Sequence, residues 1–243
     1  MKNWKHYSFE ILVIFFGISI SFWVDEWRED GQNKELLEEN LQSIRGELVR
    51  DTVNLDAKIQ YLDSVTSLVY PILSQKKVSF TSAQEMAHFI NALIWIGVRL
   101  EKNQGAYKSM IQNSYGQYLK NSELKKSLYN YYENRRYELL DLEYDLEKMA
   151  ERNEQMILGN VRTAEIGIAF YEGKTQKEIE KIVDLISQDL NRLLSDQFFI
   201  NQVDHQMQYM HLNIVKEQGI ETLYDHKTYI IQLIQMIDNQ LKK

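Results

Sequence analysis

The chain has 243 residues and a net charge of −7 from 28 basic and 35 acidic side chains, so any attraction to nucleic acid or acidic lipid must come from a local patch. It contains no cysteine, which excludes disulfides, thiolate chemistry and cysteine-ligated metals. With one proline, ten glycines and 44% hydrophobic residues, its composition favours long helices in a packed protein over disorder or a sheet with many turns.

The first predicted element is an N-terminal transmembrane helix within an anchor segment, residues 1–30. The uncharged run from Ile11 to Val24 has 14 residues, and tryptophan flanks it at Trp4 on one side and at Trp23 and Trp27 on the other. Such aromatic belts are typical of the two membrane interfaces. Large side chains follow the run where a cleavable signal needs small ones, so we expect an uncleaved anchor, with a buried core helix as the alternative.

This helix carries a polar stripe on one side. At about 100° per residue, the stripe contains Glu10, Gly17, Ser21, Asp25 and Arg28. A carboxylate in a membrane normally faces a partner or a water-filled lumen, and small residues let neighbouring helices approach closely. We therefore expect a closed homo-oligomer, most simply a tetramer, with the stripe facing inward to pack or to line a pore. The alternative is that Glu10 lies near one interface and reaches water.

Residues 31–243 are expected to form a helical soluble domain. The predicted fold class is thus all-α: one N-terminal transmembrane helix followed by a long helical hairpin or bundle. A single apolar face extends over residues 33–70, and the only proline, Pro71, predicts the end of that helix.

Start signals define the remaining helices. Ser82 and Glu85 are spaced as a capping box, and the very apolar helix behind them is expected to reach about Leu100 as the buried centre of the domain. A second long helix is predicted over residues 122–158, and further helices over residues 176–243. The start signals of these last helices are Thr175 with Glu178, and Ser195.

The residue patterns point away from catalysis. There is no glycine-rich phosphate loop and no nucleophile elbow. His205 and His211 are six residues apart, so they lie on different helix faces and do not match the spacing of a zinc helix. We expect no enzyme, no metal and no cofactor.

One segment departs from the acidic average. Between Glu101 and Tyr137, seven basic and three acidic residues give a local charge of +4, and the segment holds seven of the fifteen tyrosines. Positive charge that tracks phosphates and rings on which bases stack are typical of single-stranded nucleic-acid binding. The candidate nucleic-acid-binding residues are Lys125, Lys126, Tyr131, Tyr132, Arg135 and Arg136. The alternative is ordinary packing or contact with another protein.

Two stretches carry a resemblance to a known family. The first is Glu10 to Phe22 followed by Trp27, and the second is Ala106-Tyr107 with Met110-Ile111 and Asn113 to Gly116, then Leu124 and Tyr131-Tyr132. They resemble a family of small membrane-anchored proteins of Bacteroidota whose function is unknown. Asp25-Glu26-Trp27 stands where that family has Asn-Asn-Trp, and Tyr115 stands where it has Ser.

The overall plan also resembles the membrane effector of the Hailong anti-phage system. That resemblance implies an oligomeric, ligand-gated pore, held inactive by single-stranded DNA that a partner nucleotidyltransferase makes. It implies a single-pass protein of the bacterial inner membrane with its helical domain in the cytoplasm. Basic residues are nearly balanced on the two sides of the span, so the sequence leaves the orientation open. The alternative function is an envelope scaffold that binds protein partners.

Overall fold

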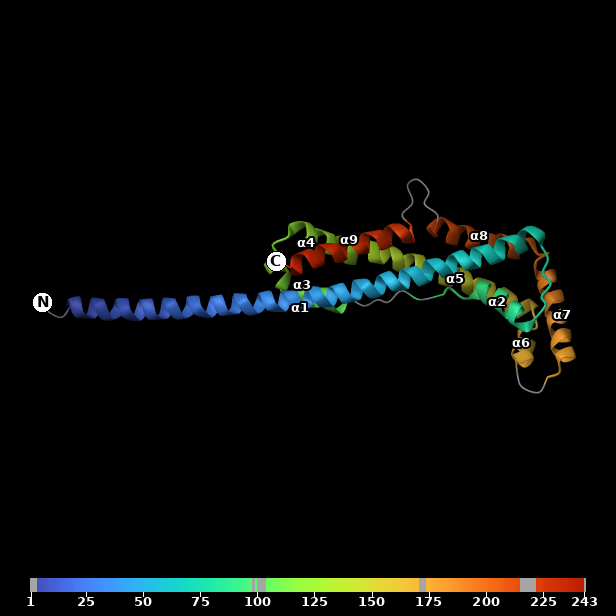
Figure 1. Ribbon diagram of the computed structural model, residues 1–243, viewed down its shortest axis with the longest axis horizontal. Helices are drawn as coiled ribbons and strands as arrows, with labels where there is room; N and C mark the ends of the chain where they lie inside the picture. The colour runs from blue at the N-terminus through green and yellow to red at the C-terminus, as the bar shows by residue number, and fades with distance from the viewer. Residues whose placement is uncertain (1–3, 98, 100–103, 171–173, 215–221, 243) are drawn as a thin grey trace. The chain divides into compact units, whose positions relative to one another are not determined.

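The computed structural model describes residues 4–97, 99, 104–170, 174–214 and 222–242, and every regular element in these ranges is helical (Figure 1). The elements are α1 (Trp4–Gln75), α2 (Ala83–Ile94), α3 (Gly105–Gln112), the 3-10 helix η1 (Tyr115–Tyr118), α4 (Ser122–Asn130), the π-helical turn η2 (Tyr131–Arg135), α5 (Arg136–Asn160), α6 (Thr163–Phe170), α7 (Gln176–Leu193), α8 (Gln197–Ile214) and α9 (Leu223–Leu241). The predicted all-α class is confirmed. Within the described ranges, the structure contains no helix that combines the length and the apolar character needed to cross a membrane.

The chain divides into two compact units. Unit 1 comprises residues 1–47, 103–129 and 233–243, and unit 2 comprises residues 48–102 and 130–232.

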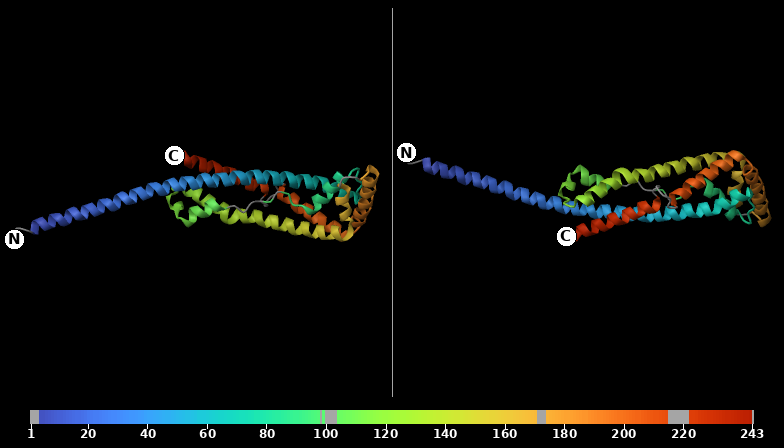
Figure 2. Two further views of the ribbon diagram at one scale, coloured as in Figure 1. Left: turned by 90° about the horizontal axis from the view of Figure 1, so that it is seen from below. Right: turned by 90° about the horizontal axis from the view of Figure 1, so that it is seen from above.

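Helix α1 is longer than the sequence indicated. It is one continuous helix of 72 residues, without a break at Gly31, and the predicted end before Pro71 is wrong because the helix continues to Gln75 (Figure 2). A proline in a helix removes one backbone hydrogen bond and crowds the preceding turn. Here Val69 and Leu73, on either side of the proline, are both buried, and their packing holds the last turn in place.

In unit 1, α1 forms the support for three short elements and the end of α9. The amide nitrogen of Asn33 donates a hydrogen bond to the Tyr118 hydroxyl of η1 over 3.0 Å. Further along α1, the Arg45 guanidinium contacts the Asp238 carboxylate of α9 at 2.5 Å. This ion pair is half exposed, so it sets the position of α9 more than it stabilises the unit.

In unit 2, α2 is buried, as the apolar run predicted. Phe89 and Leu93 are 1% exposed, and α2 contacts α5, α6 and α7. The Ser82 hydroxyl accepts the Glu85 backbone N–H, which confirms the predicted cap, whereas the Glu85 carboxylate accepts from Thr81. The helix ends at Ile94, short of the predicted Leu100, because the backbone becomes extended at the next residue.

The start of α7 has the cap that the sequence predicted, and the cap of α8 lies one residue later than predicted. Thr175 and Glu178 form the predicted capping box at the start of α7. Helix α8 is capped by Asp196, and not by the predicted Ser195, because the Asp196 carboxylate accepts the backbone N–H groups of residues 198 and 199. Gly219, which predicts a boundary between the last two helices, lies outside the described residues.

In the segment after α2, Gly97 has a backbone conformation that residues with a Cβ rarely adopt. Its φ is +76°, and a Cβ there would overlap the ring of Tyr61, whose hydroxyl is held by the Trp95 carbonyl at 2.6 Å. We therefore expect Gly97→Ala to lower the free energy of unfolding by at least about 1–3 kcal/mol, measured by urea unfolding. Gly159→Ala is the control, because a Cβ at this helical glycine meets no atom within 4 Å. Equal unfolding midpoints for the two variants would contradict this reading.

Candidate functional site

The N-terminal part of α1 exposes large apolar side chains around its whole circumference. These residues are Phe9, Ile11, Leu12, Val13, Ile14, Phe15, Phe16, Ile18, Ile20, Phe22, Trp23, Val24 and Trp27, each between 48% and 75% exposed. Successive helical residues are turned by about 100°, so the four apolar residues from Ile11 to Ile14 point to all sides. A helix that is apolar all round is suited to burial on every side, whereas an amphipathic helix is covered on one face.

The five residues of the predicted polar stripe all lie in this part of α1. Glu10, Gly17, Ser21, Asp25 and Arg28 are all exposed. The Ser21 hydroxyl donates to the Gly17 carbonyl over 3.0 Å, and Arg28 lies 3.9 Å from the Asp25 carboxylate. A Cβ at Gly17 would meet no atom within 4 Å, so the backbone is open to a close neighbour at this point.

Of the six nucleic-acid candidates, two lie in unit 1 and four in unit 2, and three of those in unit 2 are buried. Lys125 and Lys126 are exposed on α4 in unit 1. In unit 2, Tyr131 and Tyr132 are each 1% exposed and Arg136 is 3% exposed. The assignment of these three residues to an accessible ligand surface is therefore wrong, because neither ring has a free face on which a base could stack.

The π-helical turn explains why adjacent tyrosines are both buried. A π turn inserts one extra residue into a helix, and such turns occur frequently at functional sites. Each residue then turns the helix by less than an α-helical step, so Tyr131 and Tyr132 both face the interior, with their ring centres 5.0 Å apart and nearly perpendicular. A regular α-helix would have turned one of them towards solvent.

A buried ion pair lies beside this turn. The Asp51 carboxylate accepts hydrogen bonds from the Tyr131 hydroxyl at 2.6 Å and from the Arg136 guanidinium at 2.5 Å. The Arg136 side chain is 4% exposed and the Asp51 side chain 12%. Burial, together with the negative charge of Asp51, raises the pKa of Tyr131 well above its ordinary value, so the phenol stays neutral. The cluster holds α1, η2 and α5 of unit 2 together.

Arg135 is engaged within the same unit. Its guanidinium carbon lies 4.2 Å from the centre of the Tyr229 ring, and the amide of Asn130 donates to the Tyr229 hydroxyl over 3.3 Å. A guanidinium over an aromatic face is attracted by the electron density of the ring. This contact joins η2 to α9 inside unit 2.

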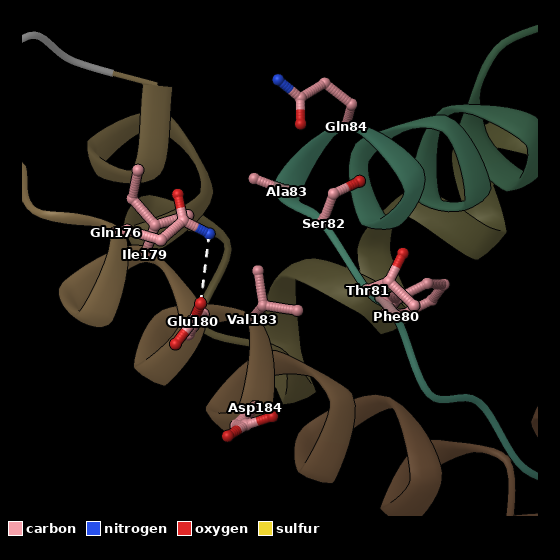
Figure 3. A pocket seen from close by; sticks show the side chains of 10 residues that line it. All are labelled: Phe80, Thr81, Ser82, Ala83, Gln84, Gln176, Ile179, Glu180, Val183 and Asp184. Atoms are coloured by element: carbon pink, nitrogen blue, oxygen red, sulfur yellow. Dashed lines mark hydrogen bonds between the residues drawn. The ribbon is translucent and has the colours of Figure 1, made fainter.

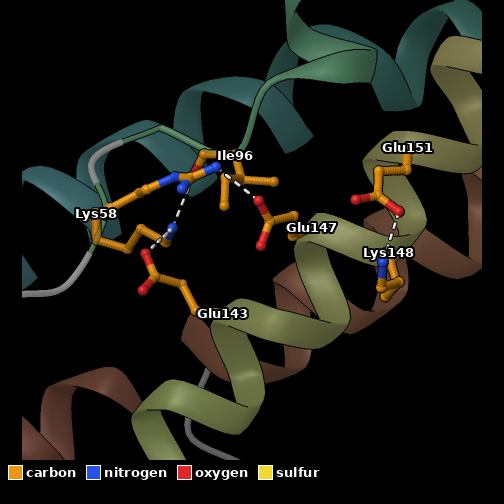
Figure 4. Close-up of polar contacts among 7 residues, drawn as sticks. Lys58, Ile96, Glu143, Glu147, Lys148 and Glu151 are labelled. Carbon is orange, nitrogen blue, oxygen red and sulfur yellow. Dashed lines mark hydrogen bonds and ion pairs between the residues drawn. The ribbon is translucent and has the colours of Figure 1, made fainter. Parts of the chain in front are cut away.

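A second buried cation lies further along α1. The Lys58 ammonium, whose side chain is 0% exposed, donates to the Ile96 carbonyl at 2.7 Å and lies 3.3 Å from Glu143 (Figure 4). Burial lowers the pKa of Lys58, and the Glu143 carboxylate opposes that shift. The ammonium is enclosed by its partners, so it stabilises the packing of α1 against α5 and is closed to a dissolved substrate.

Of the hollows in unit 2, two adjoin α2. One, of about 160 Å³, lies between the first turns of α2 and α7 and is lined by residues that include Phe80, Val183 and Asp184 (Figure 3). Ser82 and Thr175 already cap these two helix starts, so their backbone N–H groups are not all available to an anion. The other, of about 230 Å³, is largely apolar. Among the residues that the structure describes, no three histidine or acidic side chains converge to hold a metal.

Asp51, and its pairing with Arg136, were not predicted from the sequence. The sequence did contain a sign of this pair. Apolar residues recur every three or four positions along α1, but between Leu48 and Leu55 the position that continues this spacing is not apolar. Asp51 occupies that position, and Arg136 occupies the corresponding gap before Leu139. When two apolar stripes are each interrupted by one charged residue, and the two charges are opposite, the pattern indicates a buried ion pair.

Comparison with known protein families, with curated proteins and with solved structures finds no match to this chain.

Proposed function

We propose that this chain is an oligomeric membrane effector, anchored by the first part of α1. The observation that carries the proposal is the exposed apolar surface from Phe9 to Trp27. Each large apolar side chain gains about 1.5–3 kcal/mol when it leaves water, so thirteen exposed ones strongly favour a non-aqueous surrounding. Lipid can cover large apolar side chains over most of the circumference of a helix, whereas a protein groove covers one side, and the large apolar residues of this segment point in more than one direction.

The shortness of the segment favours association of several copies. The 14 residues from Ile11 to Val24 extend over about 21 Å, less than the roughly 30 Å of a bilayer core. Glu10 and Asp25, which bound the run, would therefore approach the hydrocarbon region of a single inserted helix. When several copies place the stripe inward, both carboxylates face a shared polar interior, and Gly17 allows close approach. An assembly of this kind provides a pore.

The plan resembles that of the Hailong effector, and anti-phage defence through membrane permeabilisation is the role that we propose. The nucleic-acid ligand is not carried forward, because three of the six candidate residues are buried. This burial favours one alternative, a membrane-anchored scaffold, in which the helical region binds protein partners and the anchor conducts nothing.

Membrane association tests the proposal. The double variant Phe15→Lys with Phe16→Lys should move the protein from the floating vesicle fraction to the soluble fraction, because each lysine at a helix centre costs about 2.5–3.5 kcal/mol in a bilayer. The matched control is Val49→Lys with Val53→Lys, two residues that are also apolar and exposed on α1 but lie in unit 2. Equal flotation of wild type and both variants, after an alkaline wash, would contradict the anchor.

A further inference from the structure

Unit 1 carries two exposed faces of opposite charge, one on α1 and one on α4. We propose that neighbouring copies of the chain contact each other head to tail through these faces. The acidic face, Glu35, Glu38 and Glu39 of one copy, would lie against the basic face, Lys125 and Lys126 of the next. The inference rests on the proposed oligomer and specifies which surfaces its subunits share.

The acidic face points away from the interior of unit 1. On α1, Leu37 and Leu41 are buried at 5% and 1% exposure. At about 100° per residue, Glu35 and Glu39 lie roughly 160° from Leu37 on the helix, and Glu38 lies between the two sides. All three glutamates are exposed, and none forms an ion pair with another residue that the structure describes.

The basic face is also exposed, and its charge is opposite to that of the acidic face. Lys125 and Lys126 are exposed on α4, whose buried residues are Leu124 and Leu128, and Tyr129 beside them is 59% exposed. Within the described ranges, neither lysine forms an ion pair. The exposed tyrosine adds a large apolar surface to the charges, as is common in contacts between proteins.

The segment that leads into α4 is held beside the stretch of α1 that carries the acidic face. The Asn33–Tyr118 hydrogen bond, and the bond from the Ala106 N–H to the Glu47 carboxylate at 3.1 Å, hold α3 and η1 beside residues 33–47 of α1. The acidic face lies within that stretch, and α4 begins four residues after η1 ends. The basic face therefore follows, a few residues along the chain, from a segment that is anchored beside the acidic face.

The arrangement selects one type of assembly. The two faces lie on different helices of unit 1, so one copy can offer its acidic face to one neighbour and its basic face to another. Contacts of this head-to-tail type close into rings when the rotation permits. The charges fix the register and orientation of the subunits, while the apolar segment supplies the burial that holds them together.

Cysteine cross-linking tests the contact, and the natural absence of cysteine makes each introduced thiol unique. Full-length Glu39→Cys and Lys125→Cys chains are mixed before assembly in a mild detergent and treated with a short bifunctional thiol reagent. The expected product is a dimer that contains one chain of each kind, formed in the mixture and in neither variant alone. A dimer of Glu39→Cys with itself, or no mixed dimer from a fully assembled sample, would overturn the head-to-tail contact.

Charge reversal provides an independent measurement. Lys125→Glu with Lys126→Glu places like charges together and should raise the concentration for half-assembly about tenfold or more at low salt. Assembly should return when these chains are mixed with chains that carry Glu35→Lys and Glu39→Lys. The control is Lys177→Glu with Lys181→Glu, the same charge change on α7. Assembly that is unaffected by reversal refutes this contact alone, whereas a wild-type chain that stays monomeric and leaves the membrane refutes the proposed function.

Discussion

Replacing Asp51 by alanine is expected to lower the free energy of unfolding by about 3–5 kcal/mol, the usual cost of leaving a buried charge without its partner. The Arg136 side chain is 4% exposed, and the carboxylate of Asp51 neutralises it at 2.5 Å. The same substitution removes the acceptor of the Tyr131 hydroxyl, which is 2.6 Å away. Urea unfolding of the full chain in mild detergent, followed by circular dichroism, measures the change.

A second variant separates the charge from the packing. Asp51→Leu combined with Arg136→Met removes both members of the pair and keeps apolar volume in their place. Replacing a complete buried pair by apolar residues is often neutral, so we expect the double variant to recover most of the stability. A loss below about 1 kcal/mol for Asp51→Ala, or a double variant as unstable as the single one, would contradict the role of the ion pair.

Leakage through the membrane should depend on one side of the N-terminal helix. Gly17→Leu is expected to abolish dye release from vesicles that contain the assembled protein, because the larger side chain blocks close approach of neighbouring helices. Glu10→Leu is expected to do the same by removing the carboxylate from the polar interior. The matched control is Ser19→Leu, since Ser19 is a small residue on the opposite side of the same helix.

The three leakage measurements also separate a pore from a scaffold. Unchanged release in Gly17→Leu and Glu10→Leu would refute a conduit lined by the stripe, and an equal loss in Ser19→Leu would assign the effect to insertion and not to the stripe. A wild-type protein that floats with vesicles and releases no dye would favour the scaffold.

The helices and their buried faces could be predicted from the sequence because they depend on local periodicity. The α1 residues assigned to an apolar face from their three- and four-residue spacing are buried, among them Leu41, Ile44 and Leu62. The cap at Ser82 and the capping box at Thr175 were equally readable, since each involves residues that are three positions apart.

The features that the sequence concealed depend on distant partners. Pro71 lies inside a helix because the surrounding side chains are packed against other elements, and this packing outweighs the local preference. The burial of Tyr131 depends on Asp51, which is 80 residues away, and on a π turn that periodicity does not reveal. Lys125 and Lys126, in contrast, are exposed, and no distant partner is needed to explain their position on α4.

Labelling of single cysteines on the two sides of the apolar segment tests the central claim most directly. Lys2→Cys and Gln42→Cys flank the segment, and the chain has no other thiol. In sealed vesicles of one orientation, a membrane-impermeant maleimide should label one of the two positions at once and the other only after permeabilisation, because the helix between them crosses the bilayer. Immediate labelling of both positions in intact vesicles would show that the segment does not cross, and the membrane-effector account would be wrong.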